Sequence, residues 1–439
     1  MKAFSDTGRA YDHLLCADTG VDRQNGRLCP EAGKACNYDP ILVNAGDHIR
    51  IKTEGVRYRL FRYGTEPEKR WIEEYEYAPE GNWFPFLENQ DQTWYDSELI
   101  ADESAYCRFV LQGVEGCTFL EDVVEFSRVK RTEKKEWISR EVQHLTDRID
   151  REKLPKGLSF VLLSDTHYAI GGNWKDTFQS IKEAKDRLNP AGIIHLGDLT
   201  DGMYPLNVTK SFASRVLTDL RSLRRPLYLC LGNHDANYFR GNTEQLSKKE
   251  QAAFYQRRRK PYYYQDFRKQ RIRLVFLDSF DPERKQRYGF SLQQYLWLRR
   301  ILRRTKRSWH ILVFSHVTPV AKLHVWSDDI LRGEKMLRLL AQRKEQVLGW
   351  IHGHSHADQV YLQTPFPVIG IGCGKQESFQ EHKPEGSVTC SRKAGTPEQE
   401  LWDVLYVPED GSKLFFFRYG AGKDRIIERK EDGQWRAGN

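Results

Sequence analysis

The sequence predicts an α/β fold for residues 157–439 and an all-β, sandwich-like accessory domain for residues 1–128. The first prediction depends on an alternation of strand-like and helical patterns after Gly157, which is typical of a sheet covered by helices. The second depends on short segments of period-two alternation that are separated by turns. A third observation concerns function, because five of the strand-like segments after residue 157 end in Asp, Asn or His.

Composition sets broad limits on the class of protein. A chain of 439 residues is long enough for two or three domains with sizeable cores. The formal net charge of +8 favours anionic partners without identifying one. No apolar segment approaches the roughly 20 residues of a membrane span, and the first residues lack a secretory pattern. We therefore expect no membrane span and a cytoplasmic location.

The eight cysteines form no C-x-x-C pair. Reduced thiols are the simplest interpretation, and a zinc or disulfide site at Cys16, Cys29 and Cys36 is the alternative. Residues 1–40 are polar, so we expect an irregular lead-in or a small cysteine-containing cap.

The predicted accessory domain shows strand patterns at residues 48–52, 57–61 and 106–111. Its many Trp and Tyr residues suit a sandwich core, and they would equally suit sugar stacking. Contact with a glycan or a surface through this domain is therefore an alternative role.

Residues 129–156 predict a charged helical linker. The segment opens with Lys, Arg and Glu, and its apolar residues then recur at helical spacing on one face. Pro155 and Gly157 end the helix.

The third region, 157–439, alternates strands and helices before it ends in a hairpin. Strands are predicted at 158–164, 192–196, 226–231, 272–278 and 309–314, and helices at 174–188, 209–223, 247–259, 291–304 and 333–343. This order predicts a largely parallel sheet. Strands at 401–407 and 413–419 flank the turn signal Pro408-Glu-Asp-Gly411.

Metal-ligand side chains stand where the strand patterns stop, which indicates one shared site at one sheet edge. The segments read Asp165-Thr-His167, Gly197-Asp198, Gly232-Asn-His-Asp235, Ser315-His316 and His352-Gly-His-Ser-His356. Asp and His suit manganese, iron and zinc. Two divalent ions about 3.5–4 Å apart need a bridging carboxylate and several further ligands.

The spacing within these motifs also carries information. On an extended backbone, Asp165 and His167 point the same way and can hold one ion together, and the same argument applies to His354 and His356. Gly197 and Gly353 allow a tight turn or a close backbone approach.

Together these motifs resemble the complete motif set of the calcineurin-like metallophosphoesterases, in the family's order, over roughly residues 158–360. The intact D-x-H and the lack of a Tyr three residues after Asp198 argue against the purple acid phosphatase branch. The resemblance implies a four-layer αββα sandwich with two divalent metal ions, manganese and/or iron, with zinc as another option. It implies that one metal is held by Asp165, His167, Asp198 and His356, and the other by Asp198, Asn233, His316 and His354.

The resemblance further implies that a hydroxide between the metals attacks the phosphorus atom while His234 assists the leaving group. Asp201 would orient His234, with Asp235 as a competing partner. The motif spelling resembles bacterial phosphodiesterase-type members, so we expect a phosphodiester rather than a monoester as the small substrate.

Three further expectations concern the surroundings of the site. The loop residues Tyr168, Trp174, Tyr204, Asn237 and Tyr238 follow the motifs and could line a substrate pocket, or they could be ordinary packing. We interpret His195, His310, His324 and His352 as structural. Residues 257–264, Arg-Arg-Arg-Lys-Pro-Tyr-Tyr-Tyr, have a composition that could bind nucleic acid, so a nuclease is the alternative enzyme. The favoured interpretation of that stretch is a solvated helix end, a proline break and a strand.

Overall fold

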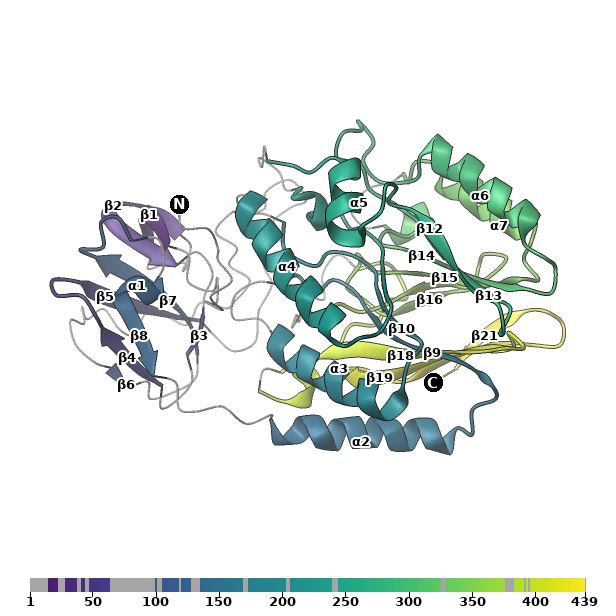
Figure 1. The fold of residues 1–439 in the computed structure, drawn as a ribbon, viewed down its shortest axis with the longest axis horizontal. Coiled ribbons are helices and arrows are strands. Elements are labelled where there is room, and N and C mark those ends of the chain that lie inside the picture. Colours follow the sequence, from purple (N-terminus) through teal and green to yellow (C-terminus); the bar gives the residue numbers. More distant parts are fainter. Residues whose placement is uncertain are drawn as a thin grey trace. The chain divides into compact units, whose positions relative to one another are not determined.

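The computed structural model describes residues 15–22, 28–37, 41–43, 47–63, 99–100, 105–117, 120–127, 135–168, 173–202, 206–238, 244–324, 329–375, 383–390, 392–393 and 395–438 (Figure 1). The chain forms two compact units. One contains the described residues up to 127, and the other contains the described residues from 135 onward.

The first unit is an antiparallel β-rich region, as predicted. One sheet has the order β1-β2-β7-β3, with β5 also paired to β7, and the other has the order β6-β4-β8. The strands are β1 (Leu15–Val21), β2 (Leu28–Asn37), β3 (Ile41–Val43), β4 (His48–Ile51), β5 (Arg57–Tyr63), β6 (Leu99–Ile100), β7 (Ala105–Gln112) and β8 (Val124–Ser127), and one short helix, α1 (Leu120–Val123), precedes β8. The alternation in β5 buries Tyr58 and Leu60. Part of the polar stretch before residue 40 forms the antiparallel pair β1–β2.

The second unit contains two mixed sheets. The first sheet has the order β11-β10-β9-β18-β19-β20-β21. Its strands are β9 (Gly157–Leu163), β10 (Gly192–His195), β11 (Leu227–Leu229), β18 (Leu401–Pro408), β19 (Lys413–Gly420), β20 (Arg425–Arg429) and β21 (Trp435–Gly438). The first three strands are parallel, whereas β18 joins β9 antiparallel and begins an antiparallel series.

The second sheet has the order β12-β13-β14-β15-β17-β16. Its strands are β12 (Tyr263–Phe267), β13 (Ile272–Phe276), β14 (His310–Ser315), β15 (Val347–His352), β16 (Gln359–Tyr361) and β17 (Val368–Gly370). The central strands are parallel, and the two edge strands are antiparallel. The predicted parallel arrangement therefore holds for one end of the first sheet and for the centre of the second, and antiparallel strands complete both.

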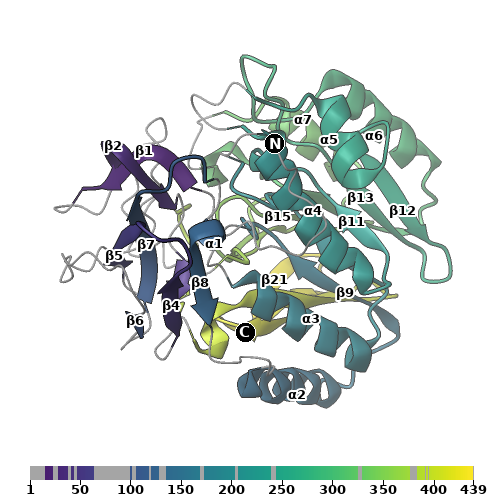
Figure 2. The same cartoon turned by 60° about the vertical axis from the view of Figure 1, so that its left-hand side comes forward.

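The two sheets face each other and helices cover their outer sides, which makes a four-layer αββα sandwich (Figures 1 and 2). Apolar side chains of both sheets, such as Phe160 and Leu312, fill the space between them. Helices α2 (Glu136–Arg151), α3 (Trp174–Leu188), α4 (Leu206–Ser222) and α5 (Lys248–Gln256) pack on the first sheet. Helices α6 (Leu292–Arg304) and α7 (Gly333–Ala341) pack on the second.

Helix α2 is shorter than the predicted linker and packs within the second unit. It buries Ile138, Val142 and Leu145, and it contacts α3 and β19. The apolar stripe read from the sequence is therefore the face that packs on the αββα sandwich. The boundaries 1–128, 129–156 and 157–439 stay a prediction.

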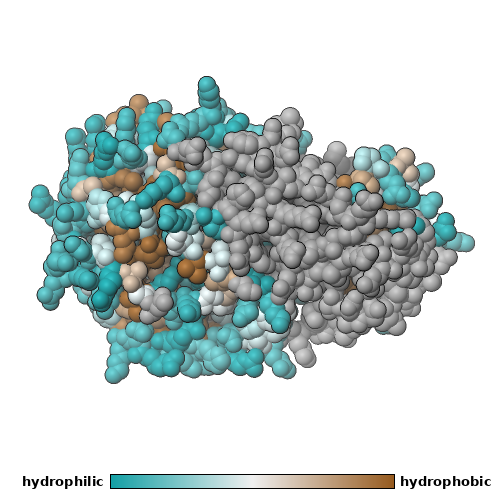
Figure 3. All heavy atoms as spheres, turned by 180° about the vertical axis from the view of Figure 1, so that it is seen from behind, coloured by the Kyte–Doolittle hydropathy of each residue, from teal (hydrophilic) through white to brown (hydrophobic). Residues whose placement is uncertain are grey.

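None of the described helices combines the length and apolarity that a bilayer crossing requires. Figure 3 shows, from behind, a mostly hydrophilic surface on the described residues that encloses a smaller hydrophobic area.

Candidate metal centre

The site is built at the carboxyl ends of two neighbouring strands in each sheet and in the loop after a fifth strand. Asp165 and His167 follow β9, Asp198 follows β10, and His316 follows β14. His354 and His356 follow β15, and Asn233 precedes the short helix η1 (His234–Ala236) after β11. All of these side chains lie in the second unit, so the αββα sandwich supplies every predicted ligand.

The backbone at the D-x-H and H-x-H motifs is not extended, and in this respect the sequence-based expectation was wrong. Asp165 and His167 have φ values of 52° and 39°, and His354 and His356 have φ values of 67° and 51°. Asp198 shares this left-handed conformation, with φ 55°. Such backbone is unfavourable for residues other than glycine, and its concentration at one place is a mark of functional sites.

Glycines let the loops approach each other at the centre, as predicted for Gly197 and Gly353. Gly197 has φ 110°. A Cβ atom at Gly353 would lie 2.0 Å from Ser164 Oγ, and one at Gly232 would lie 2.0 Å from Asp198 Oδ1. Any side chain at these two positions would displace the carboxylates.

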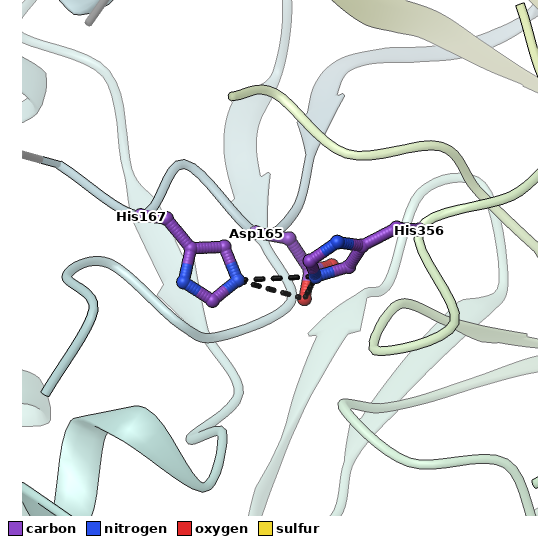
Figure 4. Close-up of side chains that lie close together, drawn as sticks. All are labelled: Asp165, His167 and His356. Atoms are coloured by element: carbon purple, nitrogen blue, oxygen red, sulfur yellow. Dashed lines mark hydrogen bonds and ion pairs between the residues drawn. The ribbon is translucent and has the colours of Figure 1, made fainter. Parts of the chain in front are cut away.

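The first group of donor atoms consists of Asp165, His167 and His356 (Figure 4). His356 Nε2 lies 3.2 Å from Asp165 Oδ1 and 3.1 Å from His167 Nε2. Two imidazole nitrogens at that distance repel each other unless a proton or a metal cation lies between them. Burial would raise the pKa of Asp165, but the nearby His316 and His356 outweigh it and hold that pKa well below its usual range.

The second group consists of Asp198, His316 and His354, and Asn233 adjoins it. His316 Nε2 lies 3.0 Å from Asp198 Oδ2, 3.1 Å from His354 Nδ1 and 3.2 Å from Asn233 Oδ1. The other ring nitrogen, His316 Nδ1, faces the carbonyl oxygen of Leu196 at 3.1 Å. That contact places the proton on Nδ1 and leaves Nε2 as an acceptor for a cation.

Asp198 adjoins both groups, because its Oδ2 also lies 3.8 Å from His167 Nε2. His167, Asp198 and His234 form a third set whose donor atoms lie within 4.8 Å of one another. His234 Nδ1 faces the backbone carbonyl oxygen of Asp201, and its amide donates to Asp198 Oδ1 at 2.8 Å. This contact of Asp201 with His234 is therefore made by the backbone carbonyl of Asp201 and not by its carboxylate.

The Asp201 carboxylate contacts two other groups. Its Oδ1 lies 3.0 Å from His167 Nδ1, and both oxygens lie 3.1 Å from Lys375 Nζ. Burial would raise the pKa of Asp201, but the Lys375 ammonium and His167 hold it below its usual range. The carboxylate is thus ionised and fixes the ring of His167 so that its Nε2 faces Asp165.

Asp235 and His195 hold the loops beneath the site. The Asp235 carboxylate accepts from the amides of Asp198, Leu199 and Gly232 at 2.9, 3.0 and 2.8 Å. Burial lowers the pKa of His195 to about 3, so the ring is neutral. Its Nδ1 can accept from the amide of Gly197 at 3.1 Å, and its Nε2 can donate to Thr166 Oγ1 at 3.2 Å.

The donor set fits divalent metal ions. Asp165, Asp198 and His316 are at most 1% exposed, and buried carboxylates cluster with imidazoles in this way when cations compensate their charge. Carboxylate, amide and imidazole donors suit manganese, iron and zinc. The site provides two groups of such donors joined by one shared carboxylate.

The predicted pocket residues lie in several environments. Trp174 and Asn237 are buried, and they contact Asp219 and Thr209 through hydrogen bonds of 3.0 and 2.7 Å. The ring of Tyr168 packs on Phe212, with 5.4 Å between the ring centroids. The ring of Tyr238 packs on Phe280 at 5.1 Å. Tyr204 lies outside the described residues.

Sequence reasoning missed two side chains at the site. His324 Nε2 lies 3.1 Å from His354 Nε2, and no motif marks it. Lys375 follows the apolar segment Val368-Ile-Gly-Ile-Gly-Cys-Gly. Asp198 was identified because an apolar segment ends in a glycine directly before it. Lys375 follows an apolar segment and Gly374 in the same way, so the sequence pattern could have identified it.

Comparisons with known proteins gave one family match and several similar solved structures. Residues 158–358 match the model of the calcineurin-like phosphoesterases. A dimetal phosphatase from Danio rerio is 16% identical with a TM-score of 0.49, and the alignment covers 62% of this chain and 99% of that chain. A purple acid phosphatase from yellow lupin is 12% identical with a TM-score of 0.45, covering 93% of this chain and 76% of that chain. A structure of PhoD is 9% identical with a TM-score of 0.46, and the alignment covers 98% of this chain and 93% of that chain. No curated protein matches the chain.

Proposed function

Residues 158–358 belong to the calcineurin-like phosphoesterase family, and from this premise we propose that the protein hydrolyses a small phosphodiester. Metal-dependent hydrolysis of a phosphate ester is the activity of the class. The diester is the favoured substrate because the motif spelling around Asp165, Asp198 and Asn233 resembles phosphodiesterase-type members.

One observation carries the proposal: side chains from distant parts of the chain converge so that Asp198 adjoins both groups of donors. In this proposal Asp165, His167, Asp198 and His356 hold one ion, and Asp198, Asn233, His316 and His354 hold the other. Manganese or iron is the favoured pair, and zinc would also suit these donors. When bound, two divalent ions would lower the pKa of a coordinated water molecule and neutralise phosphoryl oxygens.

The chain's own residues then handle the leaving group. Because His234 Nδ1 faces the Asp201 carbonyl, that nitrogen keeps its proton. Nε2 can then give a proton to the departing alkoxide from the imidazolium form, in which both ring nitrogens are protonated. The Asp201 carboxylate orients the ring of His167, whereas the contact with His234 is made by the Asp201 backbone carbonyl. Residue 201 would therefore orient two histidines, one through its side chain and one through its backbone.

The test is hydrolysis of bis(p-nitrophenyl) phosphate and p-nitrophenyl phosphate by chelated protein after addition of manganese, iron or zinc. We expect no activity after chelation and a recovery on the diester that exceeds the recovery on the monoester. Absence of hydrolysis of both compounds with every metal would contradict the enzymatic proposal. Recovery on the monoester alone would contradict the diester proposal and leave the enzyme class intact.

A further inference from the structure

The positive charge of the chain is concentrated on one part of the second unit. Residues 257–273 and 296–307 together contain fourteen Lys and Arg residues and one acidic residue, Asp266. This excess is larger than the +8 of the whole chain, so the remainder of the chain is net acidic. We use the name α6–β12 face for the exposed side chains of residues 257–273 and 292–307.

The cations of this face are available to a partner. Asp266 is engaged by Arg273, with Nε at 2.7 Å from Oδ1. For the other thirteen cations, no ion pair with a carboxylate is found among the residues that the structure describes. All thirteen side chains are exposed.

The two segments lie side by side in the fold (Figure 1). Trp297 of α6 packs on Tyr262 and on Tyr264 of β12, with centroid distances of 5.0 and 6.3 Å. At the other end, Arg273 of β13 donates to Thr305 just after α6. The β12–β13 turn, which carries Arg268, Lys269 and Arg271, therefore adjoins the carboxyl end of α6.

Helix α6 also exposes large aliphatic side chains beside these cations. Leu292 and Leu296 are 52% and 43% exposed, and Arg299, Arg300 and Arg303 are exposed further along the helix. Leu296 follows Leu292 by four residues, and Arg299 and Arg300 follow Leu296 by three and four. Residues at these spacings lie on one side of a helix, so the leucines and arginines form one stripe. Leucine gains nothing from a phosphate backbone, whereas it gains free energy when it enters the acyl boundary of a bilayer.

The aromatic residues of this face are poorly arranged to stack nucleic-acid bases. Tyr263 is buried, and its hydroxyl group lies against Leu229. The guanidinium of Arg273 lies 4.3 Å from the ring of Tyr264, and Trp297 packs on Tyr262. Base stacking requires open ring faces, and protein groups already cover one face of each ring here. At an interface, partly exposed aromatics beside cations suit the headgroup region.

We propose that the α6–β12 face docks the protein on an anionic membrane surface, with its cations on lipid phosphates and with Leu292 and Leu296 inserted into the interface. A basic helix that also exposes apolar residues binds membranes through charge and buried apolar area together. The proposal concerns attachment of the folded protein to one leaflet and does not depend on the activity at the metal centre.

The test is cosedimentation of the full chain with vesicles of phosphatidylcholine alone and of phosphatidylcholine mixed with phosphatidylglycerol. We expect binding to the mixed vesicles, weakened by salt, and no binding to phosphatidylcholine alone. The triple variant Arg299→Gln, Arg300→Gln, Arg303→Gln should lose about 100-fold in affinity, since each cation near the surface contributes severalfold. The double variant Leu292→Ser, Leu296→Ser should lose roughly tenfold or more.

A matched control removes the same charge elsewhere. Arg140, Arg151 and Lys182 are exposed cations on α2 and α3, and their triple Gln variant should bind vesicles like the wild type. An equal loss in this control would overturn the proposal, because net charge alone would then explain binding. Failure of the wild type to bind the mixed vesicles would also overturn it, and so would binding to a short oligonucleotide without vesicle binding. Circular dichroism and thermal unfolding confirm that each variant is folded before it is compared.

Discussion

At the scale of single residues, polar side chains around the metal centre have divided roles. Asp198 adjoins both donor groups, Asp235 accepts hydrogen bonds from three backbone amides, and Asp201 joins His167 to Lys375. The sequence predicted that Asp198, Asp201 and His167 gather, because each follows the end of a strand pattern, and it missed Lys375. It could not predict which atom of Asp201 faces which histidine, since that depends on loop conformation.

His234 gives the first test at this scale. We expect His234→Ala to retain both metals, because the two predicted ligand sets do not include it, and to lose about 10²–10⁴-fold in turnover from lost proton transfer. Elemental analysis and steady-state kinetics on the diester measure the two effects. Near-normal turnover in the metal-loaded variant would exclude the proposed role.

Glu400 gives a test that is independent of the metals. Burial, and then the nearby Asp176 carboxylate, raise the pKa of Glu400 to about 8, although Ser180 donates to it at 2.6 Å. The ordinary value is 4.5, so between about pH 4.5 and 8 the folded state holds a proton that the unfolded state has lost. This contribution to stability is complete below pH 4.5 and is lost as the pH rises toward 8.

Glu400→Gln should therefore flatten the pH dependence. Over pH 5.5–7.5 the wild type should lose about 1.4 kcal/mol of unfolding free energy per pH unit more than the variant does. Urea unfolding of chelated protein at several pH values measures this difference. Parallel profiles for the two proteins would show that Glu400 is ionised when folded.

At the scale of elements, patterns predicted the helices that have one apolar stripe and the buried core strands, and missed two short strands of the second sheet. Helix α3 has the predicted bounds, Trp174–Leu188, because its apolar stripe is regular. Strands β16 and β17 have only three residues each, too few to show a period. The left-handed residues at the strand ends also escaped prediction, because packing around the site imposes a conformation that Asp and His rarely adopt.

Two glycines test this packing, Gly349 within β15 and Gly353 directly after it. A Cβ atom at residue 353 would lie 2.5 Å from Asp165 Oδ2, whereas one at residue 349 would have no atom closer than 3.2 Å. We expect Gly353→Ala to displace Asp165 and weaken metal binding by roughly 10–100-fold, measured by metal titration. Gly349→Ala, within β15, is the control and should bind metal normally. Equal metal affinities in the two variants would show that the loop relaxes around the methyl group.

At the scale of the whole molecule, the metal centre joins loops from both sheets of the sandwich, since Asp165 and Asp198 follow one sheet while His316 and His356 follow the other. Bound ions should therefore stabilise the entire unit. At a free manganese concentration of 100 times the dissociation constant, each site should add about 2.7 kcal/mol to the free energy of unfolding. Thermal unfolding with and without metal measures this effect.

Asp198→Asn is the matching variant for that measurement. It removes the negative charge shared by the two groups while preserving size, so the added metal should produce little shift in its unfolding temperature. Two equivalents of tightly bound metal in the purified variant would contradict the bridging role of Asp198.

The pairing of β9 with β18 has a consequence for how the protein is made. Leu162 pairs with Asp403, so the first strand of the sandwich leaves the ribosome long before its neighbour is translated. At about 5–20 residues per second, the interval is roughly ten to fifty seconds. Throughout that time one side of β9 lacks its partner strand, so this sheet can be completed only after the last hairpin has been translated.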